Sequence, residues 1–354
     1  MNIVNASYEL IQEPSISKKI EQIARLCYKS EDKIKEGSDL KMINTLIKHQ
    51  HTAMLEHGSM AVIVDHCTYA LVHEAIDMAK TYAYDGHNPV RDYLRFSVHL
   101  NPEKTEETEE GTTVEYAPDR YVISGNMRAW INAFETLLKI DCLPPTLCAT
   151  LVVNSNGVMD KYIGNGSVDD VYLQGENTEL TAEYITDYTT LSDEERILHE
   201  DISILFTVDR GVTHEMVRHR DCSFAQESTR YVNYSDGKYG AEITVVKPCF
   251  WPEESALYKQ WAAGCEEAES GYMRLISLGA TPQQARDILP TSTKAEIVMT
   301  ASLREWSHIL KLRACNSTGS AHPQIVEVML PLAKEFKAGS YAFAFKDLVI
   351  PESK

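Results

Sequence analysis

Hydrophobic residues follow a helical period near the N-terminus and a strand-like pattern farther along. Apolar side chains recur every three to four residues over residues 16–29 and 40–50, as one buried face of a helix requires. Residues 60–64 and 202–208 are short β-prone runs, and residues 241–246 form a third candidate strand. Because these strands do not alternate with helices as βαβ units, the pattern predicts a mixed α+β fold.

The C-terminal half carries longer helical patterns, which Pro252, Gly279 and Pro290 separate. The helices predicted there cover residues 212–220, 253–278, 281–288 and 293–314. The chain contains neither a GxGxxG pattern nor a P-loop, which argues against the nucleotide-binding folds that depend on them.

Charge is unevenly distributed along the chain. Of the formal net charge of −18, residues 101–201 contribute −15, with 21 acidic against 6 basic residues. Residues 103–110 are polar and low in complexity, and we expect a solvated loop there. We interpret residues 68–201 as a large acidic insertion within a catalytic core that residues 1–67 and 202–354 form.

Composition narrows the functional classes. The net charge argues against a surface that wraps a polyanion. No apolar run approaches the roughly 20 residues of a membrane span, and the first residues lack the features of a secretory signal. Eight cysteines without a CxxC pattern favour a reduced, cytoplasmic location. No metal site is predicted, since the histidine pairs His49/His51 and His66/His73 lack partners at ligand spacing.

The densest chemistry lies in residues 218–231, whose sequence is RHRDCSFAQESTRY. Planar guanidinium groups suit phosphates and carboxylates, so the arginines of this segment are candidates for binding an anionic ligand. The alternative is a set of salt bridges at a helix C-terminus, where cations are favoured in any case. On chemistry alone both interpretations stay open.

The order of residues in this segment resembles the signature of flavin-dependent thymidylate synthases, which is RHR followed by seven residues and Ser. Arg218, His219, Arg220 and Ser228 fill that pattern. Further blocks that are similar to the family stand in the family's order: HQHTAMLEH at residues 49–57, THEMV at 213–217, ARDILP at 285–290, SLREW at 302–306, LKLR at 310–313 and AHPQI at 321–325.

The resemblance implies a homotetrameric enzyme with the thymidylate synthase-complementing fold, in which helices surround a small antiparallel sheet. Such an enzyme methylates dUMP to dTMP in active sites that subunits share. 5,10-Methylenetetrahydrofolate is the carbon donor, and NADPH reduces a bound FAD that supplies the hydride. The expected partners are these small molecules and further copies of the chain, with no nucleic acid and no membrane.

The resemblance also assigns binding residues by position. The family's flavin contacts fall on His51, Arg218, His219, Arg220, Ser302, Arg304 and His308. Its dUMP contacts fall on Glu215, Met216, Val217, Arg218, Gln226, Glu227, Ser228, Thr229, Arg230, Arg286 and Arg313. Arg313 becomes the catalytic cation beside the uracil, and Ser228 a hydroxyl that orients the substrate. Arg230 and Arg286 suit the phosphate, and backbone N–H groups of residues 226–228 are candidates to complete that anion site.

Cys222 lies inside the signature and invites the nucleophilic role that a cysteine has in conventional thymidylate synthases. We favour a reaction without an enzyme nucleophile, because the family pattern has no fixed cysteine there. Ala53, Ser302 and His308 depart from the family's common pattern. The last two stand where some members have asparagine, and both can still form hydrogen bonds.

Two alternative functions remain open. A related flavin- and folate-dependent hydroxymethyl- or methyltransferase that acts on another pyrimidine nucleotide would carry the same blocks. A single-stranded nucleic-acid-binding protein would use the arginines together with aromatic residues such as Phe224, Tyr231 and Tyr234. The net charge makes this second alternative the weaker one.

Helix geometry adds an expectation about the site. If residues 293–314 form one straight helix at about 100° per residue, Arg304 and His308 face away from Arg313. Either the helix breaks near residues 310–312, or it lies between two active sites and serves one from each face. The second interpretation agrees with shared sites in a tetramer.

Overall fold

The computed structural model describes residues 1–82, 94–108, 111–139, 143–160, 181–230, 232–237 and 240–351. They form two compact units: the first consists of Met1–Gln12, Gln22–Lys33 and Ile202–Lys354, and the second of Glu13–Glu21 and Ile34–Asp201. Both units combine helices with antiparallel strand pairs, which confirms the predicted α+β class. None of the helices in the described ranges is both long and apolar enough to cross a bilayer.

The first unit is built around a four-stranded sheet with the order β2-β7-β10-β8. Its strands are β2 (Ser7–Leu10), β7 (Asp201–Asp209), β10 (Lys294–Ser302) and β8 (Ser223–Gln226). β2 runs antiparallel to β7, and β8 runs antiparallel to β10 with Gln226 opposite Ile297. β7 confirms the strand predicted at residues 202–208.

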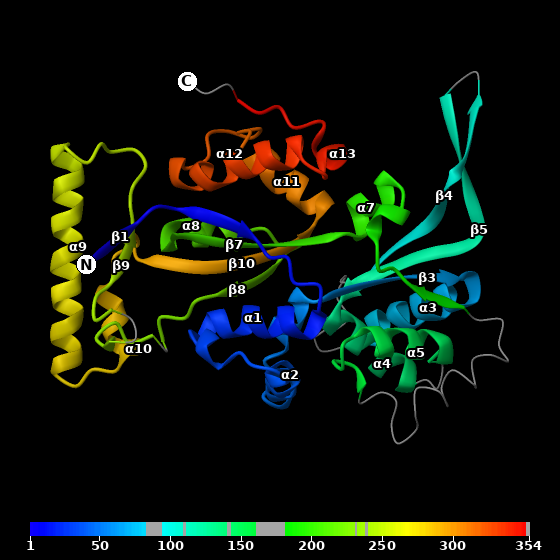
Figure 1. Ribbon diagram of the computed structural model, residues 1–354, viewed down its shortest axis with the longest axis horizontal. Helices are drawn as coiled ribbons and strands as arrows, with labels where there is room; N and C mark the ends of the chain where they lie inside the picture. Colours follow the sequence, from blue (N-terminus) through cyan, green and yellow to red (C-terminus); the bar gives the residue numbers. More distant parts are fainter. Residues whose placement is uncertain are drawn as a thin grey trace. The chain divides into compact units, whose positions relative to one another are not determined.

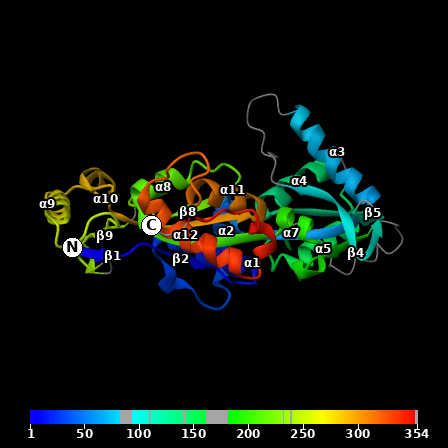
Figure 2. The same ribbon diagram turned by 90° about the horizontal axis from the view of Figure 1, so that it is seen from above.

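Helices from the C-terminal part of the chain cover one face of this sheet (Figures 1 and 2). They are α11 (Leu303–Arg313), α12 (Pro323–Ala338) and α13 (Ala342–Phe345). Trp306 and Phe336 are buried in the core, and Trp306 Nε1 donates to the carbonyl of Ile202 at 3.1 Å. This packing fixes α11, which carries several predicted site residues, against the sheet.

A second group of elements in the first unit includes the N-terminal strand. β1 (Asn2–Val4) pairs in parallel with β9 (Thr244–Val246). The helical segments beside them are α9 (Ala256–Ser277), α10 (Pro282–Ala285) and the 3-10 turn η6 (Arg286–Ile288). Tyr234 and Tyr272 belong to the buried cluster of this group. The elements predicted at residues 241–246, 253–278 and 281–288 are confirmed to within a few residues.

The predicted helix over residues 293–314 is wrong in its first half. Lys294–Ser302 form β10, and α11 begins only at Leu303, with Ser302 as its N-cap. β10 is a central strand in which every residue from Ile297 to Ser302 is buried, so the corresponding sequence IVMTAS is a mostly apolar run without regular alternation. Because such a run does not alternate, its pattern alone does not distinguish a buried strand from a buried helix.

The second unit contains a four-stranded antiparallel sheet with the order β4-β5-β3-β6. Its strands are β4 (Arg95–Thr108), β5 (Gly111–Asn126), β3 (Ser59–Asp65) and β6 (Ala182–Tyr184). Its helical segments are α2 (Ser38–Lys48), η2 (Thr52–His57), α3 (His66–Tyr82), α4 (Met127–Lys139), α5 (Pro145–Asn154), η4 (Tyr188–Thr190) and α7 (Asp193–His199). α1 (Ile16–Tyr28) contributes residues to both units. These elements confirm the predicted strand at residues 60–64 and the two N-terminal helices.

The solvated loop expected over residues 103–110 is wrong where the structure describes it. Residues 103–108 belong to β4, which pairs with β5 so that Thr105 lies opposite Val114. The glutamates of this segment indicate solvation, but the threonines between them are β-branched and favour an extended strand.

The two units do not follow the division that the charge pattern suggests. Residues 34–67, which the sequence analysis assigns to the core, pack in the second unit because β3 is a central strand of its sheet. Which residues work together in catalysis is a separate matter. The core of residues 1–67 and 202–354 and the insertion of residues 68–201 therefore stay predictions.

A buried ion pair joins Asp201, the last residue of the second unit, to Arg95 in the sheet of that unit. Arg95 in β4 donates two hydrogen bonds to the Asp201 carboxylate, at 2.6 and 2.8 Å, and Ser59 Oγ donates a third at 2.7 Å. Burial alone would raise the pKa of Asp201, but Arg95 and these hydrogen bonds hold it below its usual value. Loss of one partner would leave the other charge buried and unpaired.

We expect Arg95→Met to lower the free energy of unfolding by about 3–5 kcal/mol, because Asp201 would stay buried without the guanidinium group that pairs with it. The matched control is Arg120→Met in the same sheet, whose ion pair with Glu183 is exposed and is expected to contribute about 0–1 kcal/mol. Urea denaturation followed by circular dichroism measures both variants. Equal losses in the two would contradict the role of the buried pair.

Candidate active site

Helix α8 (Arg210–Met216) presents the signature at its C-terminal end. Asp209 caps the helix, since its Oδ1 accepts the N–H of Val212 at 2.8 Å. The helix ends at Met216 rather than at residue 220 as predicted, and the N–H of His219 donates to the Met216 carbonyl at 3.1 Å. The RHR segment therefore lies in the loop between α8 and β8.

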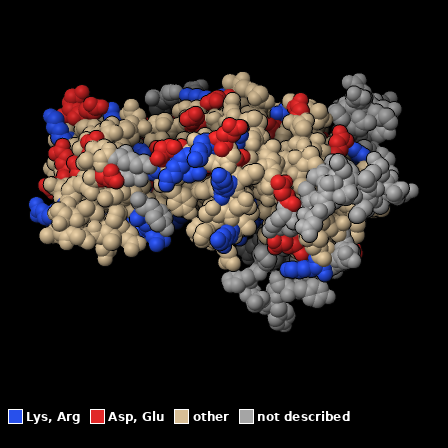
Figure 3. Space-filling model, turned by 60° about the horizontal axis from the view of Figure 1, so that its bottom comes forward, with Lys and Arg blue, Asp and Glu red and all other residues tan. Residues whose placement is uncertain are grey.

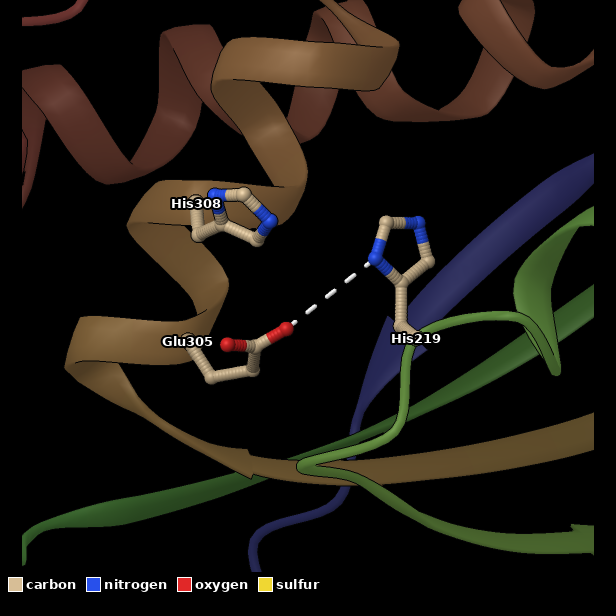
Figure 4. A group of neighbouring side chains, drawn as sticks. All are labelled: His219, Glu305 and His308. Atoms are coloured by element: carbon tan, nitrogen blue, oxygen red, sulfur yellow. Dashed lines mark ion pairs between the residues drawn. The ribbon is translucent and has the colours of Figure 1, made fainter.

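The RHR segment lies beside α11 at a cavity of about 300 Å³. The lining residues are Arg218, His219, Arg220, Asp221, Glu305, His308, Leu312 and Arg313. β8 follows the RHR loop and β10 leads into α11, so the pairing of these two strands brings the two segments together. Figure 4 shows Glu305 and His308 on α11, with His219 facing them from the loop. Predicted flavin residues and the predicted uracil cation thus meet in one place.

Arg313 is held in position by two neighbours. Its Nη1 lies 2.9 Å from Glu215 Oε2, its Nη2 donates to the Glu215 carbonyl at 3.3 Å, and its Nε donates to His219 Nε2 at 3.1 Å. It lines the same cavity as His308. Helix geometry predicts that His308 and Arg313 face different pockets, and for these two residues the prediction is wrong. The arginine side chain is long enough to reach the cavity from another side of the helix.

His219 is neutral at pH 7. Burial lowers its pKa to about 4, and the nearby charges of Arg313 and His308 act in the same direction. Since Nε2 accepts a hydrogen bond from Arg313, the ring hydrogen is on Nδ1, which lies 4.0 Å from Glu305 Oε1. Burial raises the pKa of Glu305. The contact drawn in Figure 4 is therefore a neutral imidazole beside a carboxyl group rather than a full ion pair.

The side chains in Figure 4 have the composition of a metal site, but their setting does not suit one. One ligand atom from each of His219, Glu305 and His308 lies within 4.8 Å of the others. A metal ion on Nδ1 of His219 would need that nitrogen deprotonated, whereas Arg313 fixes the hydrogen there. The guanidinium groups that line the cavity also repel a cation. The cavity is better suited to an anionic ligand.

The segment after β8 alternates in exposure. Glu227 and Thr229 are buried, Gln226 and Ser228 are half-buried, and Arg230 is exposed. Within β8, which ends at Gln226, successive side chains point in opposite directions. Thr229 and Arg230 instead lie in a turn, in which the N–H of Val232 donates to the Ser228 carbonyl at 3.3 Å. The turn therefore sets Arg230 relative to Ser228, since the N–H of Arg230 donates to Ser228 Oγ at 3.3 Å.

Two backbone N–H groups of this segment are used by the fold. That of Glu227 donates to the Glu296 carbonyl at 2.8 Å, and that of Ser228 donates to the Cys27 carbonyl at 3.2 Å. The expectation that these groups complete an anion site is therefore wrong. The sequence does not reveal this, because both acceptors lie far away along the chain.

Some predicted residues have structural contacts of their own. Met216 is fully buried, whereas Val217 is 47% exposed. Ser302 Oγ accepts the N–H of Glu305 at 3.3 Å and so caps α11. Cys222 is partly buried and packs against the hydrophobic core.

Other predicted residues do not line the cavity. Arg304 is exposed on α11, and Arg286 is exposed in η6. His51 belongs to the second unit, where it precedes η2 and is exposed. The ligand roles of these residues stay predictions.

Sequence reasoning did not single out Glu305, although it lines the cavity. The only pattern in the sequence that involves Glu305 is its spacing from Ser302. A glutamate three residues after a serine is typical of the start of a helix, so this pattern indicates a structural role and not a site residue. A larger cavity of about 520 Å³ in the first unit was also not predicted; its lining includes Glu215, Trp251 and Trp261. Among the described residues no lysine or arginine lines it, so the RHR cavity is the better candidate for anionic ligands.

Comparisons with known proteins bear on the family. The profile of the family described as thymidylate synthase complementing protein matches residues 9–81 and 149–338. The flavin-dependent thymidylate synthase of Pyrococcus furiosus is 37% identical over 106 residues, which is 30% of this chain and 43% of that protein. That of Mycobacterium avium is 25% identical over 197 residues, 51% of this chain and 76% of that protein. The chain thus covers less than half the length of the first of these relatives.

Among solved structures, the UMP/dUMP methylase PolB from Streptomyces cacaoi bound with 5-Br dUMP has 14% identity and a TM-score of 0.38, with 99% of this chain and 100% of that chain covered. A score this low carries no argument, so the assignment depends on the sequence matches. The family profile covers more than half of the chain and includes every predicted site residue. The chain therefore belongs to the thymidylate synthase complementing protein family.

Proposed function

We propose that this chain is a flavin-dependent thymidylate synthase that methylates dUMP to dTMP. 5,10-Methylenetetrahydrofolate would be the carbon donor, and FAD reduced by NADPH would supply the hydride. The observation that carries the proposal is the cavity that gathers Arg218, His219, Arg220 and Arg313 in a chain of this family.

The side chains of the cavity fit an anionic ligand that carries rings. Arg218 and Arg220 are exposed, and their guanidinium groups suit the phosphates of a flavin dinucleotide. His219 offers a hydrogen-bonding ring without adding a charge, since its pKa is about 4. When bound, FAD would supply the redox chemistry that the side chains themselves do not provide.

Arg313 would act on the nucleotide. Glu215 and His219 hold its guanidinium group before substrate arrives, so little reorganisation is needed during the reaction. A fixed cation beside the uracil would stabilise the negative charge that develops on the pyrimidine. Ser228 would orient the substrate, and the packing of Cys222 against the core supports a reaction without a cysteine nucleophile.

We also propose the finer features that the family resemblance implies. Arg230 and Arg286 would bind the phosphate, and a homotetramer would share its active sites between subunits. On the face drawn in Figure 3, basic side chains occur in small groups among acidic ones, which supports small anionic ligands over a nucleic-acid strand. No disulfide joins the seven cysteines that the structure describes, which supports a cytoplasmic location.

The purified protein should bind FAD and oxidise NADPH, and it should convert dUMP to dTMP only with methylenetetrahydrofolate present. Flavin absorbance and mass spectrometry of the nucleotide product measure this. A product that carries a hydroxymethyl group would favour the related transferase. Absence of flavin after reconstitution, or turnover without folate, would overturn the proposal.

Arg313→Met should lower kcat/KM for dUMP by between about 30-fold and several thousand-fold, because truncating a buried charged contact typically costs about 2–5 kcal/mol. Lys311→Met is the matched control, since Lys311 is exposed on the same helix and does not line the cavity. Steady-state kinetics with saturating folate measures both. An Arg313→Met enzyme that keeps wild-type kcat/KM would contradict the assigned role.

The imidazole of His219 should titrate near pH 4, well below the ordinary value of about 6.5. Because the folded pKa is depressed, the unfolded chain binds more protons between these values, so stability is lost as the pH falls toward 4. Histidine-selective NMR should show the midpoint rise in Arg313→Met, which removes one cause of the shift, but not in the control Asp221→Asn. A titration midpoint near 6.5 for His219 in the wild type would contradict the predicted low pKa.

A further inference from the structure

Two lysines and two glutamates form a cluster of ion pairs next to Ser228, and one of them is Glu227, the residue before it. In this lysine–glutamate cluster (Lys29, Glu227, Lys294 and Glu296), Lys294 Nζ lies 3.2 Å from Glu227 Oε2 and 2.8 Å from Glu296 Oε1. Lys29 Nζ forms an ion pair with Glu296 and lies 3.8 Å from Glu227 Oε2. The four side chains come from the segment after α1, from the end of β8 and from β10, all within the first unit.

The backbone of Glu227 is held as firmly as its carboxylate. Its N–H donates a hydrogen bond to the Glu296 carbonyl at 2.8 Å, and its carbonyl accepts one from Arg210 Nη2 at 3.2 Å. In return, the N–H of Glu296 donates to Glu227 Oε2 at 3.3 Å. The next residue, Ser228, donates its N–H to the carbonyl of Cys27, two residues before Lys29. The end of α1 therefore fixes this segment through backbone and side-chain contacts together.

Burial makes these contacts interdependent. The Glu227 side chain is 3% exposed, and those of Lys29 and Lys294 are 14% and 18% exposed. Burial alone would raise the pKa of Glu296, but Lys294 and Lys29 lower it, so the Glu296 carboxylate keeps its charge. Removing one cation leaves an uncompensated buried carboxylate, which favours a shift of the backbone that carries Glu227.

Lys29 also has a special backbone conformation. Its φ angle is 49°, in the left-handed region that residues with a side chain rarely adopt. The conformation ends helix α1 as in a Schellman motif, because the N–H of Lys29 donates to the Leu26 carbonyl at 3.3 Å and the N–H of Ser30 donates to the Arg25 carbonyl at 3.1 Å. Here it places Lys29 Nζ toward the two carboxylates.

The turn that follows Glu227 connects this cluster to the site. Glu227 points into the cluster, and the residues after it form a turn. In this turn the N–H of Arg230 donates to Ser228 Oγ at 3.3 Å, and the N–H of Val232 donates to the Ser228 carbonyl at 3.3 Å. We propose that Lys29, together with Lys294, is a positioning residue that sets the orientation of Ser228 and Arg230 toward the phosphate of dUMP. This inference depends on the proposed function, and it gives Glu227 a positioning role in place of a direct substrate contact.

The test compares Lys29→Met and Lys29→Arg with the wild type. We expect Lys29→Met to raise the Kd for dUMP by on the order of tenfold to a hundredfold, because a small displacement of binding groups has effects of that size. Flavin content and NADPH-dependent flavin reduction should stay unchanged, since the RHR cavity is formed by other residues. Lys29→Arg should restore most of the affinity. Calorimetry with dUMP and flavin absorbance give the two readouts.

The matched control is Lys33→Met, which removes an exposed lysine from the neighbouring 3-10 turn η1 (Glu31–Lys33) and should leave dUMP affinity unchanged. If Lys29→Met does not fold, Lys29→Gln replaces it, with the same expected loss, because it also removes the cation while its amide can still donate a hydrogen bond to the carboxylates. Wild-type dUMP affinity in folded Lys29→Met, or in Lys29→Gln where it replaces that variant, would overturn the inference, as would parallel loss of flavin. A wild type that binds flavin but no dUMP would instead overturn the proposed function.

Discussion

The antiparallel pairing of β8 with β10 is the constraint on which the candidate site depends. Toward one end of this pairing, the register that sets Gln226 opposite Ile297 brings Glu227 beside Glu296. At the other end, the RHR loop lies beside the start of α11. A slip of one residue would turn each side chain of β8 to the opposite face. Glu227 would then leave its lysines, and Arg313 would lose the alignment that places it beside His219.

Much of the fold follows from local patterns in the sequence. Two segments show their secondary structure in the sequence itself: residues 40–50 by their helical period, and residues 202–208 by their β-prone composition. β10 is different, since it is a central strand buried almost throughout and shows neither period. Residues 103–108 also mislead, because their charge indicates solvation while pairing with β5 makes them a strand. In both cases a partner distant along the chain decides the structure.

The same distinction applies to the candidate site. The order of residues around Arg218, His219 and Arg220 indicates the family, and the cavity then gathers these residues with Arg313. The partners that hold them are not visible in the sequence, because Glu215 is 98 residues from Arg313. Lys29 is farther still along the chain from Glu227 and Glu296. Sequence patterns therefore predict which residues carry the chemistry. Only the tertiary contacts separate a residue that binds a ligand from one, such as Glu227, that positions its neighbours.

Burial in the RHR cavity shifts the pKa values of His219 and Glu305 toward their neutral forms, so the arginines provide most of the charge there. It lowers the pKa of His219 and so removes a cation at neutral pH, and it raises the pKa of Glu305 and so weakens an anion. Guanidinium groups keep their charge across the whole range in which proteins are stable. The positive potential of the cavity therefore depends on Arg218, Arg220 and Arg313 rather than on histidine. A site of this kind attracts anionic ligands with little dependence on pH, while its neutral imidazole stays available as a hydrogen-bonding surface.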